Sequence, residues 1–86
     1  MRHARPDDLL QIEGLVDELR AIDGLVERTP GSFYRGSTAF LHFHIDGDDV
    51  YCDVKLSGPD FDRVKVTTDD EQQALLAAVR RTLATS

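Results

Sequence analysis

Apolar residues at intervals of three and four mark a helix near the start of the chain. These positions fall on one helical face: Leu9, Ile12, Val16 and Leu19. Pro6 suits the first turn, where its missing N–H would have no partner, and Gly24 is placed to end the helix in a left-handed conformation. Gly14 inside the helix is costly, and we interpret it as a close approach of a neighbouring backbone.

Strict alternation of apolar and polar residues predicts two paired strands over residues 38–45 and 50–56. The apolar positions share one face: Leu41, Phe43, Ile45, Val50, Cys52, Val54 and Leu56. The opposite face, called the candidate binding face, would carry five residues: Phe40, His42, His44, Tyr51 and Asp53. A two-residue turn would pair His44 with Asp49, and a four-residue turn would pair it with Tyr51. Both turns keep these faces, because they differ by two residues.

The flanking segments complete the expected fold. Residues 25–29 are a short strand whose place in the sheet stays open, residues 32–37 a loop or an irregular strand, and residues 61–67 a further strand. Thr68 and Glu71 have capping-box spacing before a closing amphipathic helix. We therefore expect an α+β domain over residues 1–86. It would have an antiparallel sheet of three to four strands, with an N-terminal and a C-terminal helix on one face and residues 1–5 disordered.

Charge and cysteine content narrow the function classes. The chain has 16 acidic and 10 basic residues, a net charge of −6, and only Arg80 and Arg81 are adjacent cations. We expect no nucleic-acid partner and no docking on an anionic membrane, since both need clustered cations. The single cysteine, Cys52, forms no internal disulfide and is expected in the core as an inert thiol. No apolar run approaches the roughly 20 residues of a membrane span, and no signal-peptide region is evident at the N-terminus. A cytoplasmic location is therefore expected.

The pair His42 and His44 is the main candidate for chemistry. Two imidazoles on one strand face can supply two of the ligands of a zinc, nickel or iron site. The third ligand would be a carboxylate of the hairpin: Asp49, Asp53 or Asp46. The candidate metal-binding set is therefore His42, His44 and Asp49. His3 is set aside because it lies in the N-terminal segment.

Two other interpretations of the histidines stay open. Each could be a solvent-facing side chain bonded to a cross-strand carboxylate or tyrosine. General acid–base catalysis by His42 with Asp53, or by His44 with Asp49, is geometrically possible. A flat sheet face in a small domain offers little depth for a substrate, which favours a binding role over catalysis. No cofactor is expected.

Several segments resemble the small bacterial "luciferase-domain" proteins. The similarity covers roughly residues 24–82 and rests on residues 40–44, the acidic-glycine turn after them, residues 53–56 and residues 64–70. The resemblance implies a compact α+β domain with a histidine-containing central strand. The chain lacks the longer aromatic segment expected before the last strand, and no luciferin or flavin site is evident. It is also similar in layout to the bacterial YjbR-like domains.

The sequence thus predicts a non-catalytic interaction or ligand-binding module that uses the candidate binding face. Self-association or a protein partner is the expected occupant, because joining two such faces would bury Phe40 and Tyr51. The alternative is a metal- or histidine-dependent enzyme of unknown substrate.

Overall fold

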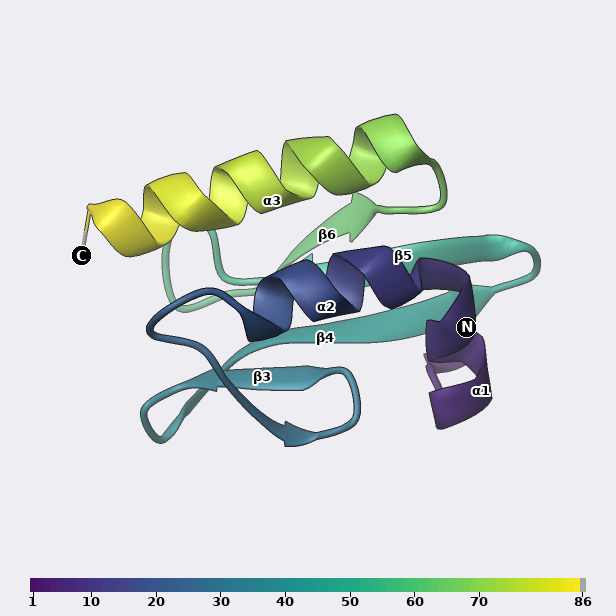
Figure 1. Ribbon diagram of the computed structural model, residues 1–86, viewed down its shortest axis with the longest axis horizontal. Helices are drawn as coiled ribbons and strands as arrows, with labels where there is room; N and C mark the ends of the chain where they lie inside the picture. The colour runs from purple at the N-terminus through teal and green to yellow at the C-terminus, as the bar shows by residue number, and fades with distance from the viewer. Residues whose placement is uncertain (86) are drawn as a thin grey trace.

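The computed structural model describes residues 1–85 as a layer of helices on an antiparallel sheet (Figure 1). The strands are β1 (Arg2–His3), β2 (Val26–Thr29), β3 (Ser32–Arg35), β4 (Thr38–Asp46), β5 (Asp49–Val54) and β6 (Asp62–Lys65). The helices are α1 (Pro6–Leu9), the 3-10 turn η1 (Leu10–Ile12), α2 (Glu13–Arg20) and α3 (Asp69–Ala84). The sheet order is β2-β3-β4-β5-β6, and β1 also pairs with β4.

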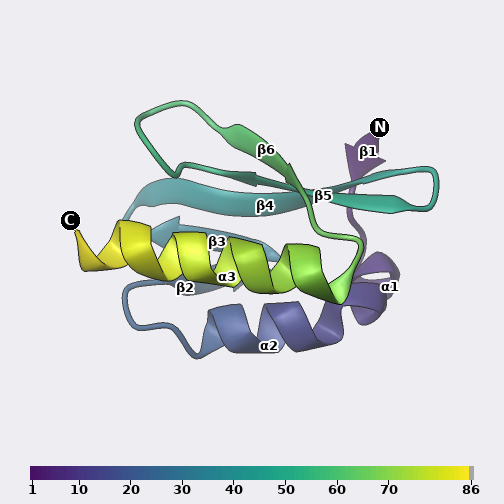
Figure 2. The same ribbon diagram turned by 90° about the horizontal axis from the view of Figure 1, so that it is seen from above.

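The helices α2 and α3 lie side by side over one face of the sheet (Figure 2). Leu19 of α2 and Leu76 of α3 are fully buried against the apolar side of β4 and β5. This arrangement confirms the expected α+β class and the shared helical face. In the part of the chain that the structure describes, no helix lies over the opposite side of β4 and β5 (Figure 2).

The expected N-terminal helix is divided into α1, η1 and α2. The division occurs at Ile12, whose φ of −123° and ψ of 30° lie outside the helical range. Gly14 near the start of α2 has nothing within 4 Å of the position of a Cβ atom. The expected close approach of a backbone at Gly14 is therefore wrong.

The sheet has six strands, more than the three to four expected. Residues 32–35, expected as a loop or an irregular strand, form β3, and residues 26–29 join the sheet as β2. Gly31 and Gly36 make this possible, because their φ angles of 76° and 59° allow tight turns on either side of β3. The first residues, expected to be disordered, include β1, which pairs with β4 through Arg2 and His3.

The β4–β5 hairpin adopts the second of the two expected registers. His42 pairs with Asp53, and His44 pairs with Tyr51. The loop itself is only two residues, 47 and 48, and Gly47 has a φ of 63°, as the first position of a type II′ turn requires. Asp53 is thereby placed beside the two histidines.

Phe40 departs from the expected alternation. Phe33 pairs with Leu41 and Tyr34 pairs with Ala39, so the β3–β4 register skips Phe40. Such a bulge adds one residue to a strand and changes which face the next side chain occupies. Phe40 is 2% exposed, belongs to the apolar core and lines a cavity with residues of α3. The expectation that Phe40 lies on the candidate binding face is therefore wrong.

The final helix begins as the sequence predicts. Thr68 Oγ1 accepts a hydrogen bond from Glu71 N at 3.2 Å, and Thr68 N donates to Glu71 Oε1 at 2.9 Å. These two bonds satisfy backbone donors that would otherwise lack partners at the helix start. Within residues 1–85, no helix has the length and apolar character needed to cross a membrane.

Gly14 provides a test of the helical assignment. Gly14→Ala should raise the free energy of unfolding by about 0.5–1 kcal/mol, because alanine loses less backbone entropy in a helix. Gly31→Ala is the control and should be destabilising, because φ is 76° and the new Cβ would lie 3.0 Å from the Leu9 methyl groups. Urea unfolding of both variants measures the difference. A destabilised Gly14→Ala variant would contradict the open space described at this position.

Candidate metal centre

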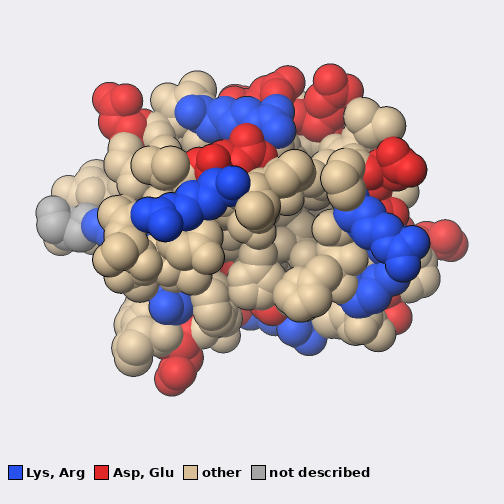
Figure 3. Space-filling view, turned by 90° about the horizontal axis from the view of Figure 1, so that it is seen from below, with Lys and Arg blue, Asp and Glu red and all other residues tan. Residues whose placement is uncertain are grey.

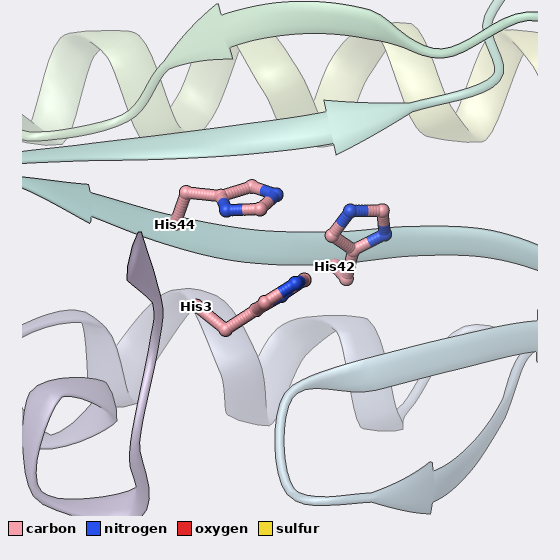
Figure 4. Close-up of side chains that lie close together, drawn as sticks. All are labelled: His3, His42 and His44. Carbon is pink, nitrogen blue, oxygen red and sulfur yellow. The ribbon is translucent and has the colours of Figure 1, made fainter. Parts of the chain in front are cut away.

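Three histidine side chains converge on the helix-free face of the sheet (Figure 4). The ring centroids are 4.5 Å apart for His3 and His44, 4.9 Å for His42 and His44, and 5.8 Å for His3 and His42. One possible ligand atom from each ring lies within 4.8 Å of the others. These three residues are called the histidine cluster.

The backbone explains why the cluster forms. His42 and His44 are two residues apart on β4 and therefore project from the same face. His3 is placed opposite His44 by the pairing of β1 with β4, which continues as Ala4 N donating to Phe43 O at 3.1 Å. Strand pairing thus brings a residue from the start of the chain beside two residues from its middle.

An ion pair helps to hold β1 in place. Arg2 donates through its guanidinium to both carboxylate oxygens of Asp8 in α1. The same carboxylate accepts from Arg5 N at 2.8 Å. The hydrogen bonds from Arg2 and Arg5 lower the pKa of Asp8 to about 2, so this carboxylate is ionised at neutral pH.

The separation of the imidazoles is close to that of a metal site. Zinc binds histidine nitrogen at about 2.0–2.1 Å in tetrahedral geometry, which places two ligand nitrogens about 3.4 Å apart. The cluster has its ligand atoms within 4.8 Å. Closure by up to about 1.4 Å through side-chain rotation would therefore bring the three rings to coordination distance. His3 is exposed on a short strand and has the freedom to make this adjustment.

Asp53 of β5 holds the histidines from one side. Its Oδ2 lies 2.9 Å from His44 Nε2 and 3.4 Å from His42 Nε2. Arg63 of β6 donates to both oxygens, from Nε at 2.8 Å and from Nη2 at 3.0 Å. These hydrogen bonds and the guanidinium charge lower the pKa of the Asp53 carboxyl, although the residue is only 7% exposed. Asp53 therefore remains an anion beside the cluster.

Burial favours the neutral form of His42. Loss of water around its ring is the largest effect and lowers its pKa, while the Asp53 carboxylate opposes this and the Arg63 guanidinium adds to it. The Phe61 ring packs edge-on against it, with centroids 4.8 Å apart. A neutral imidazole has the free lone pair that a metal ion requires.

The other candidates lie in different places. Asp49 Oδ1 accepts from Thr67 Oγ1 at 3.1 Å and lies 3.4 Å from Lys65 Nζ, so it belongs to a separate group at the hairpin end. The expected cross-strand pairing of His44 with Asp49 is wrong, because His44 pairs with Tyr51. The set of His42, His44 and Asp49 as metal ligands stays a prediction, and the structure brings His3 beside the two histidines. Tyr51 is half-buried beside His44, and Asp46 is exposed opposite Asp49.

Sequence reasoning missed two parts of this site. Arg2 and His3 form a strand of two residues, too short to show any alternation, so its pairing with β4 leaves no pattern in the sequence. Arg63 has an outward position on β6, but only the register places it opposite Asp53. The sequence offered one signal for His3: the chain has three histidines, and the cluster uses all of them.

Two small cavities adjoin the cluster. One, of about 260 Å³, is lined by His3, Thr29, Gly31, Ser32 and His42 among others, and one of about 200 Å³ shares His3, Ser32 and His42. A wider cavity of about 520 Å³ lies near Lys55 and has none of the three histidines in its lining. The space beside the histidines therefore suits small ligands.

The surface of residues 1–85 seen from below in Figure 1 has no large patch of one charge that would indicate a second binding site. There, basic and acidic side chains are intermixed (Figure 3). The expectations about nucleic-acid and protein partners stay predictions.

Comparison with family models, with curated proteins and with solved structures finds no match. The resemblance to the luciferase-domain and YjbR-like families stays a prediction.

The ion pair of Asp53 should make stability depend on pH. Asp53→Asn should lower the free energy of unfolding by about 1–3 kcal/mol at pH 7, because Arg63 loses a charged, buried acceptor. A carboxyl with a lowered pKa in the folded state stabilises the fold above its unfolded pKa of about 4 and loses this effect as pH falls through the folded value.

Urea unfolding of wild type and variant between pH 7 and pH 2 tests this expectation. The difference should persist down to about pH 5 and shrink below about pH 4. Asp60→Asn, in the exposed loop before β6, is the control and should be nearly neutral throughout. A gap between Asp53→Asn and wild type that stays constant to pH 2 would contradict the assignment.

Proposed function

We propose that this protein is a ligand-binding module whose ligand is a divalent transition-metal ion held by His3, His42 and His44. The observation that carries the proposal is the convergence of three imidazoles from two distant segments. An ordinary hydrated sheet face would account for His42 and His44, which share a strand. It gives no reason for a third imidazole to be paired opposite them.

The donor atoms indicate the class of metal. Imidazole nitrogen suits zinc, copper and nickel, whereas magnesium and calcium require oxygen ligands. Three neutral histidines with a fourth position left for water or another ligand are a known zinc arrangement. Zinc is therefore the metal chosen for the test.

In this proposal Asp53 orients the metal-binding histidines and does not itself bind the metal. Both of its oxygens already accept from the Arg63 guanidinium, and a cation at this distance opposes the approach of a second cation. A carboxylate against the outer side of a ligating histidine orients the ring and increases its basicity. Asp53 has the position for this role toward His44 and His42.

Self-association has less support than the sequence suggested. Its main argument was burial of Phe40 and Tyr51 between two copies. Phe40 is already in the core of one copy, and Tyr51 is half-buried beside His44. The histidine cluster therefore carries the proposal.

Zinc binding by the untagged protein tests this function. Wild type should bind one zinc ion per chain, and a 100-fold excess of zinc over its dissociation constant should raise Tm by about 10–20 °C. His3→Ala should weaken zinc binding by at least about 100-fold, because it removes a ligand, and Asp53→Asn by about 10–100-fold. Magnesium should give no stabilisation.

Asp49→Asn is the matched control, since Asp49 lies with Thr67 and Lys65 instead of the cluster, and it should bind zinc as wild type does. Calorimetry gives the affinities, and NMR should show zinc-induced shifts at all three imidazoles. Equal zinc affinity in wild type and His3→Ala would exclude the three-histidine site.

A further inference from the structure

We infer that the metal ion held by the histidine cluster keeps one coordination position open to a small carboxylate or similar monoanion. This anion would enter through a notch, defined as the space between β1 and β3 that is lined by His3, Ser32 and His42. The inference rests on the proposed metal site and names the ligand that completes it.

The notch results from incomplete strand pairing along one edge of β4. On this edge β3 pairs with β4 as far as Leu41, and β1 pairs with it only at His44 and Ile45. Between these two strands, Ala4 N is bonded to Phe43 O. Among residues 1–85, neither β1 nor β3 pairs with His42 on this edge, and the two cavities of about 260 and 200 Å³ lie there.

The side of the cluster toward β5 and β6 is occupied. The Asp53–Arg63 pair stands on the side of β5 and β6, with Asp53 in contact with His42 and His44. The Phe61 ring lies against His42. On the opposite side of the cluster, the notch leaves space beside His3 and His42 for a further ligand of an ion among the three rings.

Charge favours an anion as this ligand. Neutral imidazoles leave the full charge of a divalent ion uncompensated, and the charges of Asp53 and Arg63 cancel. Excess positive charge in a half-buried site attracts an anionic oxygen or nitrogen donor more strongly than a neutral one.

The size and lining of the notch narrow the ligand further. The cavities are smaller than the roughly 300–1,000 Å³ of typical small-molecule pockets. Ser32 and Thr29 offer hydroxyl donors, and Gly31 has no side chain to obstruct the space. An anion of acetate size fits within these volumes and can accept hydrogen bonds from the hydroxyl donors.

Cobalt(II) in place of zinc reports on the open position, because its visible spectrum changes when a ligand is exchanged. Acetate and azide are the probes. The spectrum of cobalt-loaded wild type should shift and saturate with each anion. Ser32→Phe, which fills the notch, should weaken anion binding at least tenfold and leave cobalt affinity within about threefold. Ser37→Phe, in the exposed turn before β4, is the matched control and should behave as wild type.

The outcomes separate this inference from the proposed function. Anion concentrations up to about 100 mM cover weak, millimolar binding. If cobalt binds and neither anion changes its spectrum in this range, the open coordination position is excluded, but the metal site stands. Equal anion affinity in wild type and Ser32→Phe would exclude the notch as the route. If cobalt does not bind at all, the proposed function fails and this inference fails with it.

Discussion

Pairing along both edges of β4 is the constraint on which the rest of the structure depends. One edge pairs with β5, and the other is shared by β3 and β1. Its inner side chains, such as Phe43, are buried beneath α2 and α3, which fixes the register, because a slip of one residue would expose them. The same register determines that His42 and His44 face outward together.

The histidine cluster is coupled to the core through this strand. Cys52 and Asp53 are neighbours on β5, and the first is fully buried while the second faces the histidines. Burial strongly raises the pKa of the Cys52 thiol, which keeps it neutral and inert in the core. Adjacent residues on one strand thus serve stability on one face and a polar site on the other.

One carboxylate, that of Asp53, lies against the histidine cluster on the open face. Asp53 contacts His42, His44 and Arg63, so its charge is compensated although its side chain is largely buried. Such a carboxylate fixes ring orientation without occupying a coordination position. For this reason we assign metal binding to the three imidazoles and the orientation of their rings to Asp53.

The sequence by itself determined the two amphipathic helices, the β4–β5 hairpin and the outward direction of His42 and His44, because these depend on local periodicity. Tertiary structure alone decided that His3 completes the cluster, that Arg63 pairs with Asp53 and that Phe40 turns into the core. The first two depend on pairing between strands that are distant or too short to show a pattern. The third depends on a bulge, which breaks the alternation from which faces are predicted.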